Sequence, residues 1–187
     1  VGFDLFTQML GQAVAEARGD EGANVEPQVV GINLPADYFL AEDFIPAVDQ
    51  RVMVYRRLAA ADTLAAIDAI QEDCENEHGE LPEAALNLFD RNRLRIRAGR
   101  LGMESVSLTG GRLVFQGVDV PRDVALDLRS RLGAVNFPRS RKIQVPYRAG
   151  AGAGSGLGRG IDAGAPGSGP VQAALALVTL LGDSEDE

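Results

Sequence analysis

Two residues in this sequence could supply a nucleophile and a base: Cys74 and His78, the only cysteine and the only histidine. An offset of four residues places both side chains on one face of a helix. A thiol beside an imidazole can carry out acyl transfer, but such a site also needs an orienting group and an oxyanion donor. No neighbouring motif signals either group. We therefore favour a histidine at a helix end, where a positive imidazole suits the helix dipole, and keep a small Cys–His hydrolase as an alternative.

The glycine-rich stretch RAGAGAGSGLGRG lacks the spacing of a phosphate-binding loop. Glycine falls on every even position from Gly150 to Gly160, whereas a dinucleotide fingerprint needs glycines at offsets two and five. A P-loop needs Gly-Lys before Ser or Thr, and the only lysine, Lys142, follows Arg141. One histidine, one cysteine and scattered acids are too few for a metal site. The sequence therefore predicts no catalytic residue, metal or cofactor in this chain.

Acidic residues gather around Cys74. Like charges within one helical turn destabilise a helix, so this cluster is either a solvated face or a docking surface for an arginine-bearing partner. Its members are Asp68, Glu72, Asp73, Glu75 and Glu77.

A basic counterpart follows in the stretch RNRLRIRAGR, which begins at Arg91. On a helix, Arg93, Arg97 and Arg100 form one stripe, whereas Arg91 and Arg95 form a second. One interpretation is a nucleic-acid-binding appendage at Arg91–Arg100, whose affinity for phosphates would fall steeply with salt. The interpretation we favour is a solvated face that pairs with nearby acids, because few aromatic residues are interleaved for base stacking.

Composition limits the class of protein. Hydrophobic residues make up 45% of the 187, enough for a core, and the net charge of −9 argues against attraction of the whole chain to nucleic acid or anionic lipid. No apolar run approaches the ~20 residues of a membrane-spanning helix, and the opening VGFDLF lacks the features of a signal peptide. A single cysteine cannot form an internal disulfide, so we expect a cytoplasmic protein with no membrane association.

The charge is unevenly distributed along the chain. Residues 1–90 hold 18 acids against four arginines, whereas residues 91–148 hold 13 bases against four acids. Such asymmetry indicates either a charged partner or a basic half that lies against the acidic half.

The hydrophobic spacing predicts which elements carry these residues. Helices are expected over 3–17, 48–60, 62–78, 80–102 and 121–133. In the second, Val48, Val52, Tyr55 and Leu58 should face inward. Asp62 is the expected N-cap of the third, and Gly79 its C-terminal glycine.

Strands complete the predicted fold. One is expected at residues 28–35, a hairpin around Gly110-Gly111, and another strand at 141–147, where Pro146 indicates an edge or an end. The apolar segment 171–182 could be a folded-back helix or part of a disordered extension. We predict an α+β fold, a helical subdomain packed with a small, mainly antiparallel sheet.

Three stretches in combination resemble a known family. They are VGFDLFTQML, LPADYFLAEDFIPAVDQRVMVYRRLAAADT and HGELPEAALNLF. Together they resemble the C-terminal region of bacterial transcription-repair coupling factors, over roughly residues 1–148. The first stretch is similar to the helix that closes the second lobe of a superfamily-two translocase motor.

The resemblance implies a motor function for the whole protein and a regulatory function for this part. The family uses ATP and Mg²⁺ to push on double-stranded DNA, releases RNA polymerase stalled at lesions and recruits the excision-repair damage-recognition protein. The motor motifs lie upstream, so this chain is expected not to hydrolyse ATP. The terminal domain of the family is a regulatory clamp that docks on an N-terminal module of the same protein and masks the repair-protein surface.

The resemblance also implies docking positions. Acidic residues of the family that meet basic residues of the N-terminal module correspond to Asp73 and Asn76. Asn76 lacks the charge, and Glu77-His78 replaces the family's arginine-phenylalanine pair. Glu72, Glu75 and Glu77 are the residues that could supply the charge instead.

The expected domain organisation has four parts. Residues 1–22 are the terminal helix of the upstream translocase module, and residues 23–148 are the C-terminal regulatory domain. A glycine-rich linker is expected at 149–170, and a short apolar segment with an acidic tail at 171–187.

Overall fold

The computed structural model describes most of the predicted regulatory domain and one helix beyond it. The expected helix at 3–17, most of the glycine-rich segment and the acidic tail lie outside the described residues. Those described are 30–132, 134–139, 141–148, 161–162 and 169–182. Within them, no helix is long and apolar enough to cross a membrane.

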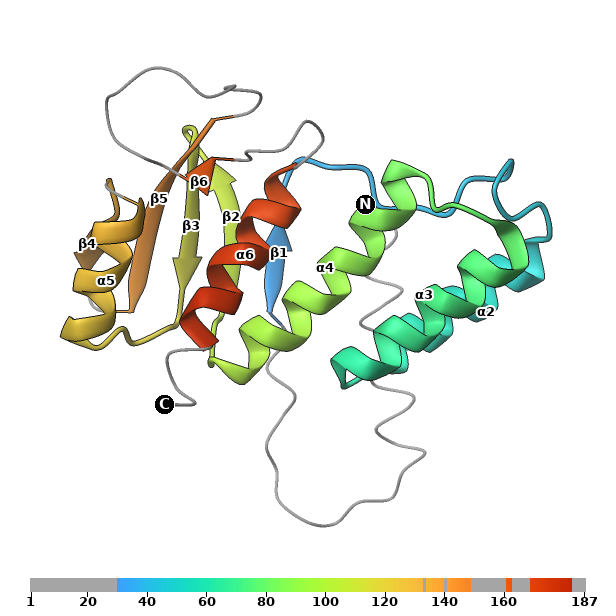
Figure 1. Ribbon diagram of the computed structural model, residues 1–187, viewed down its shortest axis with the longest axis horizontal. Helices are drawn as coiled ribbons and strands as arrows, with labels where there is room; N and C mark the ends of the chain where they lie inside the picture. Colours follow the sequence, from blue (N-terminus) through green and yellow to red (C-terminus); the bar gives the residue numbers. More distant parts are fainter. Residues whose placement is uncertain (1–29, 133, 140, 149–160, 163–168, 183–187) are drawn as a thin grey trace, which may run out of the picture.

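Three helices form one side of the molecule (Figure 1): α2 (Val48–Ala60), α3 (Leu64–His78) and α4 (Glu83–Arg100). The bounds confirm the predicted helices to within a few residues at each end. Gly79 ends α3 with φ +89°, and its N–H donates to the Glu75 carbonyl over 2.9 Å. Glycine is favoured there because a side chain is strained at positive φ.

The start of α3 differs from the prediction by one residue. The N-cap is Thr63 and not Asp62, because the Thr63 hydroxyl accepts a hydrogen bond from the Ala66 N–H over 3.2 Å. Asp62 is exposed. Both residue types cap helices well, so the sequence alone did not separate them.

The inward face of α2 matches the prediction except at Val48: Leu58 is buried, and Val52 and Tyr55 are half-buried. Val48 is 61% exposed, whereas Val54 and Leu58 are buried. Arg51 and Tyr55 occupy half-buried positions beside them and bind backbone with their polar ends: the Arg51 guanidinium donates to the Ile45 carbonyl over 2.6 Å. The half-buried Arg51 was not predicted on this face, where a long amphipathic side chain can pack its apolar part and keep its charged end hydrogen-bonded.

A mixed sheet forms the other side of the molecule. Five of its strands lie side by side in the order β1-β2-β3-β5-β4, and β6 pairs with β5. Pairings β1–β2 and β5–β6 are parallel and the rest are antiparallel, which confirms a mainly antiparallel sheet. The bounds are β1 Gly31–Asn33, β2 Ser105–Thr109, β3 Arg112–Gln116, β4 Asn136–Arg139, β5 Lys142–Arg148 and β6 Ile161–Asp162.

Turn chemistry sets the register of this sheet. Gly110 and Gly111 have φ +57° and +70°, as a two-residue hairpin turn between β2 and β3 requires. Pro146 lies beyond Gln144, the last β5 residue for which β4 has a partner, so its missing N–H costs no bond to β4.

Two helices cover the sheet, and the core divides between the two sides. The helices are α5 (Arg122–Leu132) and α6 (Pro170–Gly182). One buried cluster joins the sheet to α5, α6 and the C-terminal part of α4, and a second joins α2, α3 and the N-terminal part of α4. Helix α4 therefore connects the helical part to the sheet, and Figure 1 shows α6 lying along it.

Candidate functional site

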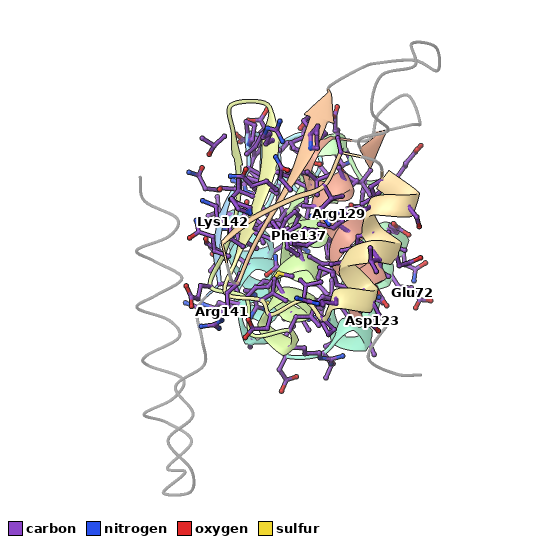
Figure 2. The ribbon with its side chains drawn as sticks, turned by 90° about the vertical axis from the view of Figure 1, so that its left-hand side faces the viewer. Glu72, Asp123, Arg129, Phe137, Arg141 and Lys142 are labelled. Carbon is purple, nitrogen blue, oxygen red and sulfur yellow. The ribbon has the colours of Figure 1, made fainter. Side chains whose placement is uncertain are left out.

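The candidate site is the acidic edge of α3, which we define as Glu72, Asp73, Glu75, Asn76 and Glu77. All five residues are exposed. Buried Ile67, Ile70 and Cys74 fix the inner face of the helix, and the helical rotation of ~100° per residue then places the five around its outer half. Figure 2 shows Glu72 at the periphery of the molecule, pointing away from it.

The outermost ridge of this edge consists of Glu72 and Asn76. Neither side chain makes a hydrogen bond or ion pair with any other residue that the structure describes. A carboxylate and a neutral amide therefore stand one helical turn apart, facing water. Such a pair can accept hydrogen bonds from a basic partner without first breaking a contact inside the domain.

Asp73 differs, because it already has a basic partner. The Arg57 guanidinium of α2 donates to its carboxylate, and the two side chains remain 45% and 55% exposed. An ion pair this exposed contributes little stability. Asp73 can thus exchange Arg57 for an external arginine at small cost.

The remaining carboxylates bind neighbours within α3. The Gln71 amide donates to Glu75 over 2.7 Å, and Glu77 lies 3.5 Å from the His78 imidazole. The His78 side chain is only 15% exposed and packs edge-on against Phe44, with ring centroids 5.7 Å apart. His78 is thus the last residue of α3, which is the helix-end position that the sequence indicated.

The arginine stripe on α4 is unevenly exposed. Arg93 is only 20% exposed and contacts two carboxylates, Asp68 at 2.7 Å and Asp90 at 3.0 Å. Arg100 is exposed and Arg97 half-buried, and neither has an ion pair with another described residue. The three arginines predicted to contact nucleic acid are therefore not equally available for it.

The second arginine stripe is part of the domain's internal structure. The Arg95 guanidinium donates to the Leu58 and Ala61 carbonyls over 3.3 and 2.7 Å, at the C-terminal end of α2. Burial lowers the pKa of Arg95, and neighbouring Arg91 lowers it further. Arg91 itself lies over the Tyr38 ring at 5.4 Å.

The Cys74–His78 pair lacks the properties of a nucleophile and its base. Cys74 is 2% exposed, and burial raises the pKa of its thiol, with nearby carboxylates adding to the rise and Arg57 opposing it. A protonated, buried thiol is a poor nucleophile. Among the described residues, no group of three or more His, Cys, Asp or Glu side chains could hold a metal ion.

A cavity of about 90 Å³ lies between the start of α5 and the end of α6. Leu101, Val118 and Val124 contribute apolar walls, and Asp119 and Asp123 contribute carboxylates. Pockets for small molecules are typically ~300–1,000 Å³. This cavity is too small for a nucleotide, and its carboxylates would repel phosphate.

One family model and the curated relatives indicate the same family. The model of the TRCF domain family matches residues 34–124. The transcription-repair-coupling factor of Mycobacterium tuberculosis (strain CDC 1551 / Oshkosh) is 30% identical over 162 residues, which cover 80% of this chain and 13% of that protein. The chain belongs to the TRCF domain family.

Further relatives carry the same description. The Escherichia coli (strain K12) transcription-repair-coupling factor is 31% identical over 109 residues, covering 57% of this chain and 10% of that protein. The Myxococcus xanthus protein of that name is 28% identical over 128 residues, covering 68% and 10%. The TRCF chain thus spans only about a tenth of the length of the curated relatives it matches.

The fold is shared with a solved structure. A crystal structure of the C-terminal domain of a transcription-repair coupling factor superposes with a TM-score of 0.62, at 12% sequence identity. The superposition covers 84% of this chain and 94% of that one. At this identity the likeness shows the fold alone, and it supports the α+β architecture of the TRCF domain.

Sequence reasoning missed three residues that bind charged side chains of α3 and α4. Arg57 binds Asp73 of the acidic edge, Asp90 binds Arg93, and Gln172 binds Asp90. Gln172 lies 82 residues from its partner Asp90 along the chain. A local motif cannot signal a contact at that separation.

Proposed function

We propose that this TRCF domain is the non-catalytic C-terminal regulatory domain of a transcription-repair coupling factor. It docks on the N-terminal module of the same protein and masks the surface that the excision-repair damage-recognition protein binds. ATP and Mg²⁺ serve the upstream motor, which acts on double-stranded DNA and stalled RNA polymerase, and this chain hydrolyses no ATP.

The observation that carries the proposal is the exposed acidic edge of α3. Glu72 and Asn76 have no partner among the described residues, and Asp73 has only an exposed ion pair. Charged groups at an interface rim confer specificity and a fast, salt-sensitive encounter more than they confer affinity. A releasable inhibitor needs a contact of that kind.

Modest energies are enough for such a clamp. Keeping the closed state at about 99:1 takes roughly 2.7 kcal/mol. Tethering within one protein gives an effective concentration on the order of 1 mM. An intrinsic dissociation constant of ~10 μM therefore suffices, which a few polar contacts can supply.

The proposal is tested by calorimetric titration of the 187-residue chain with the N-terminal module of its parent protein, at low and moderate salt. We expect micromolar binding that weakens with salt. Reversing Glu72→Lys and Asp73→Lys together should weaken it at least about tenfold, because like charges would then face each other.

A matched control reverses two acids at the opposite end of the molecule. Asp119→Lys with Asp123→Lys makes the same change in net charge beside α5 and should leave the affinity unchanged. Equal losses in both variants would indicate a general charge effect and contradict the site. No binding by the unaltered chain at either salt would contradict docking itself.

The alternative, nucleic-acid binding through α4, now rests on Arg97 and Arg100, since Arg93 is held by two carboxylates. It predicts affinity for duplex DNA that falls steeply with salt and disappears in an Arg97→Gln, Arg100→Gln variant. Gel-shift titration at two salt concentrations measures this directly.

A further inference from the structure

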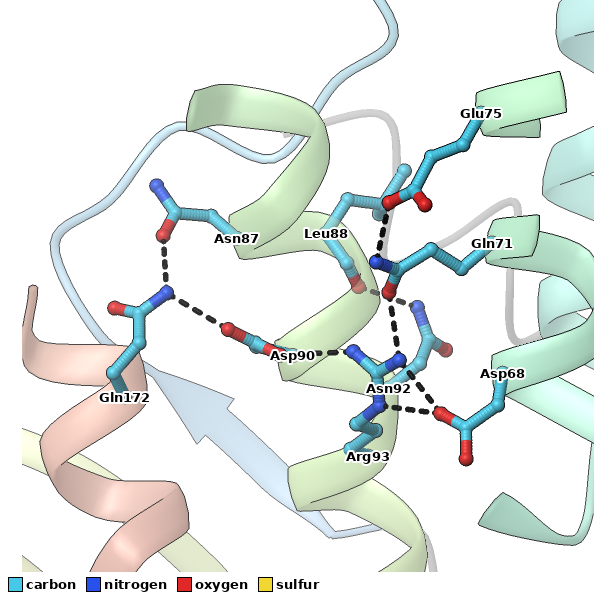
Figure 3. Close-up of polar contacts among 9 residues, drawn as sticks. All are labelled: Asp68, Gln71, Glu75, Asn87, Leu88, Asp90, Asn92, Arg93 and Gln172. Carbon is cyan, nitrogen blue, oxygen red and sulfur yellow. Dashed lines mark hydrogen bonds and ion pairs between the residues drawn. The ribbon is translucent and has the colours of Figure 1, made fainter. Parts of the chain in front are cut away.

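Helix α6 has one amide in an otherwise largely apolar sequence, and that amide is directed at α4. The Gln172 Nε2 donates to Asn87 Oδ1 over 3.0 Å and to Asp90 Oδ2 over 2.9 Å (Figure 3). The other polar side chain of the helix, Thr179, bonds to the Leu175 carbonyl within α6. Gln172 is therefore the polar side chain through which α6 binds α4.

The contact continues across α4 to α3. The second oxygen of Asp90 accepts from Arg93 Nη1 over 3.0 Å. Arg93 Nη2 then donates to Asp68 and to Gln71, each over 2.7 Å. Gln71 in turn donates to Glu75, so the chain of side chains in Figure 3 reaches the acidic edge.

The middle of this series of hydrogen-bonded side chains is shielded from water. Asp90 and Arg93 are each only 20% exposed, and charge-assisted hydrogen bonds are the stronger ones, all the more where water is partly excluded. Both Asp90 oxygens accept hydrogen bonds, one from Gln172 of α6 and one from Arg93 of α4, which in turn binds α3. Loss of the Gln172 bond should therefore alter the bond between Asp90 and Arg93.

Gln172 makes these bonds at a cost. Its Oε1 is buried and has no hydrogen-bond partner among the described residues, and an unsatisfied buried acceptor is destabilising. An apolar residue would avoid that cost. A polar contact within a largely apolar helix interface can fix the register of the two helices, which is a role that an apolar residue cannot fill.

We propose that Gln172 and Arg93 are positioning residues through which α6 holds the acidic edge of α3 in its docking geometry. Helix α6 lies outside the residues matched by the TRCF family model, 34–124, so it adds a control on a surface that lies within them. The mechanical link from α6 to α3 stands on the contacts alone. Its effect on docking rests on the proposed function.

The link is tested in the unbound 187-residue chain by hydrogen exchange. Gln172→Met keeps the length and apolar packing of the side chain and removes the amide. We expect the amides of α3 to exchange about fivefold faster, the factor for one lost hydrogen bond, while those of the β2–β3 hairpin stay unchanged. Far-UV circular dichroism and a cooperative unfolding transition verify the fold.

A double-mutant cycle separates positioning from a general loss of stability. If Gln172 acts through Arg93, then Gln172→Met adds nothing to α3 exchange in an Arg93→Met background. Asp90→Asn keeps the shape of the linking residue and should raise the exchange rate of the α3 amides as Gln172→Met does. It replaces Gln172→Met as the test if that variant does not fold. Unchanged α3 exchange, or effects that simply multiply, would overturn the link.

Docking is measured separately, by titrating the N-terminal module with the same variants. Weaker binding by Gln172→Met, with faster α3 exchange, supports the full proposal. Faster exchange with unaltered affinity overturns control of docking by α6. If the unaltered chain does not bind at all, the proposed function fails, while the exchange result still decides the link between α6 and α3.

Discussion

At the scale of single residues, the arginines of α4 show how one sequence pattern serves several structural roles. Arg91 lies over an aromatic ring, Arg93 binds carboxylates on α3 and α4, and Arg95 binds the last carbonyls of α2. The sequence interpretation that we favoured, a face pairing with nearby acids, holds for Arg93. The interior role of Arg95 was not foreseen.

Replacing Arg95 should therefore destabilise the fold more than replacing a surface arginine. Arg95→Met leaves the Leu58 and Ala61 carbonyls without their donor, which we expect to lower the free energy of unfolding by about 1–3 kcal/mol. Urea unfolding measures the change. Arg100→Met, at an exposed position on the same helix, is the control and should cost under ~0.5 kcal/mol. Equal costs would contradict a stabilising role for the Arg95 bonds to the α2 carbonyls.

At the scale of elements, α6 is part of the core and not an appendage. Val171, Ala174 and Leu177 are fully buried against α4 and the sheet. The sequence left open whether this segment folds back or extends into solvent. The described structure has the folded-back helix at 170–182, and its apolar sequence fits burial on most sides.

Truncating a buried side chain of α6 should accordingly weaken the whole domain. Leu177→Ala is expected to lower the free energy of unfolding by about 2–5 kcal/mol, because it removes apolar contacts and leaves a cavity. Leu126→Ala makes the same chemical change on α5, where the side chain is 65% exposed, and should cost under ~0.5 kcal/mol. Denaturant unfolding measures both costs from the shift in midpoint, provided that the dependence of the unfolding free energy on denaturant keeps the same slope. A small cost at Leu177 would show that α6 is dispensable for stability.

At the scale of the whole molecule, the two charged halves of the sequence only partly neutralise each other. Arg93 lies against acidic α3, whereas Arg141 and Lys142 lie toward the sheet, on the opposite side of the view in Figure 2 from Glu72. Figure 1 likewise shows α3 and α5 at opposite ends. The alternative in which basic residues lie against acidic ones thus holds in part, at Arg93. The alternative of a charged partner stays a prediction, for which the exposed acidic edge is available.

Releasing Asp73 from its internal partner should strengthen docking on the N-terminal module. Arg57→Gln removes the competing guanidinium, and we expect up to about fivefold tighter binding at low salt, the range of an exposed ion pair. Arg56→Gln makes the same change in net charge at the adjacent exposed position and isolates the general electrostatic effect. Calorimetry that finds identical affinities for the two variants would contradict a docking role for Asp73.

The sequence by itself determined the elements and the family. Helices α2 to α5 and the hairpin at Gly110-Gly111 follow from hydrophobic spacing, caps and turn glycines, which are short-range signals. The α+β class follows from their order, and the resemblance to transcription-repair coupling factors is confirmed by the TRCF family model over residues 34–124 and by the curated relatives. The acidic cluster was also visible in the sequence, because exposure of several adjacent carboxylates is the default.

Only the tertiary structure decided which of the charged residues are engaged and where α6 lies. Arg93 meets Asp68 from 25 residues away, and Gln172 meets Asp90 from 82. Such pairs depend on how the helices pack, and packing sums many weak long-range contacts that no local pattern encodes. For the same reason α2 buries Val54 where spacing alone favoured Val48: burial is a property of the partner surface as much as of the helix.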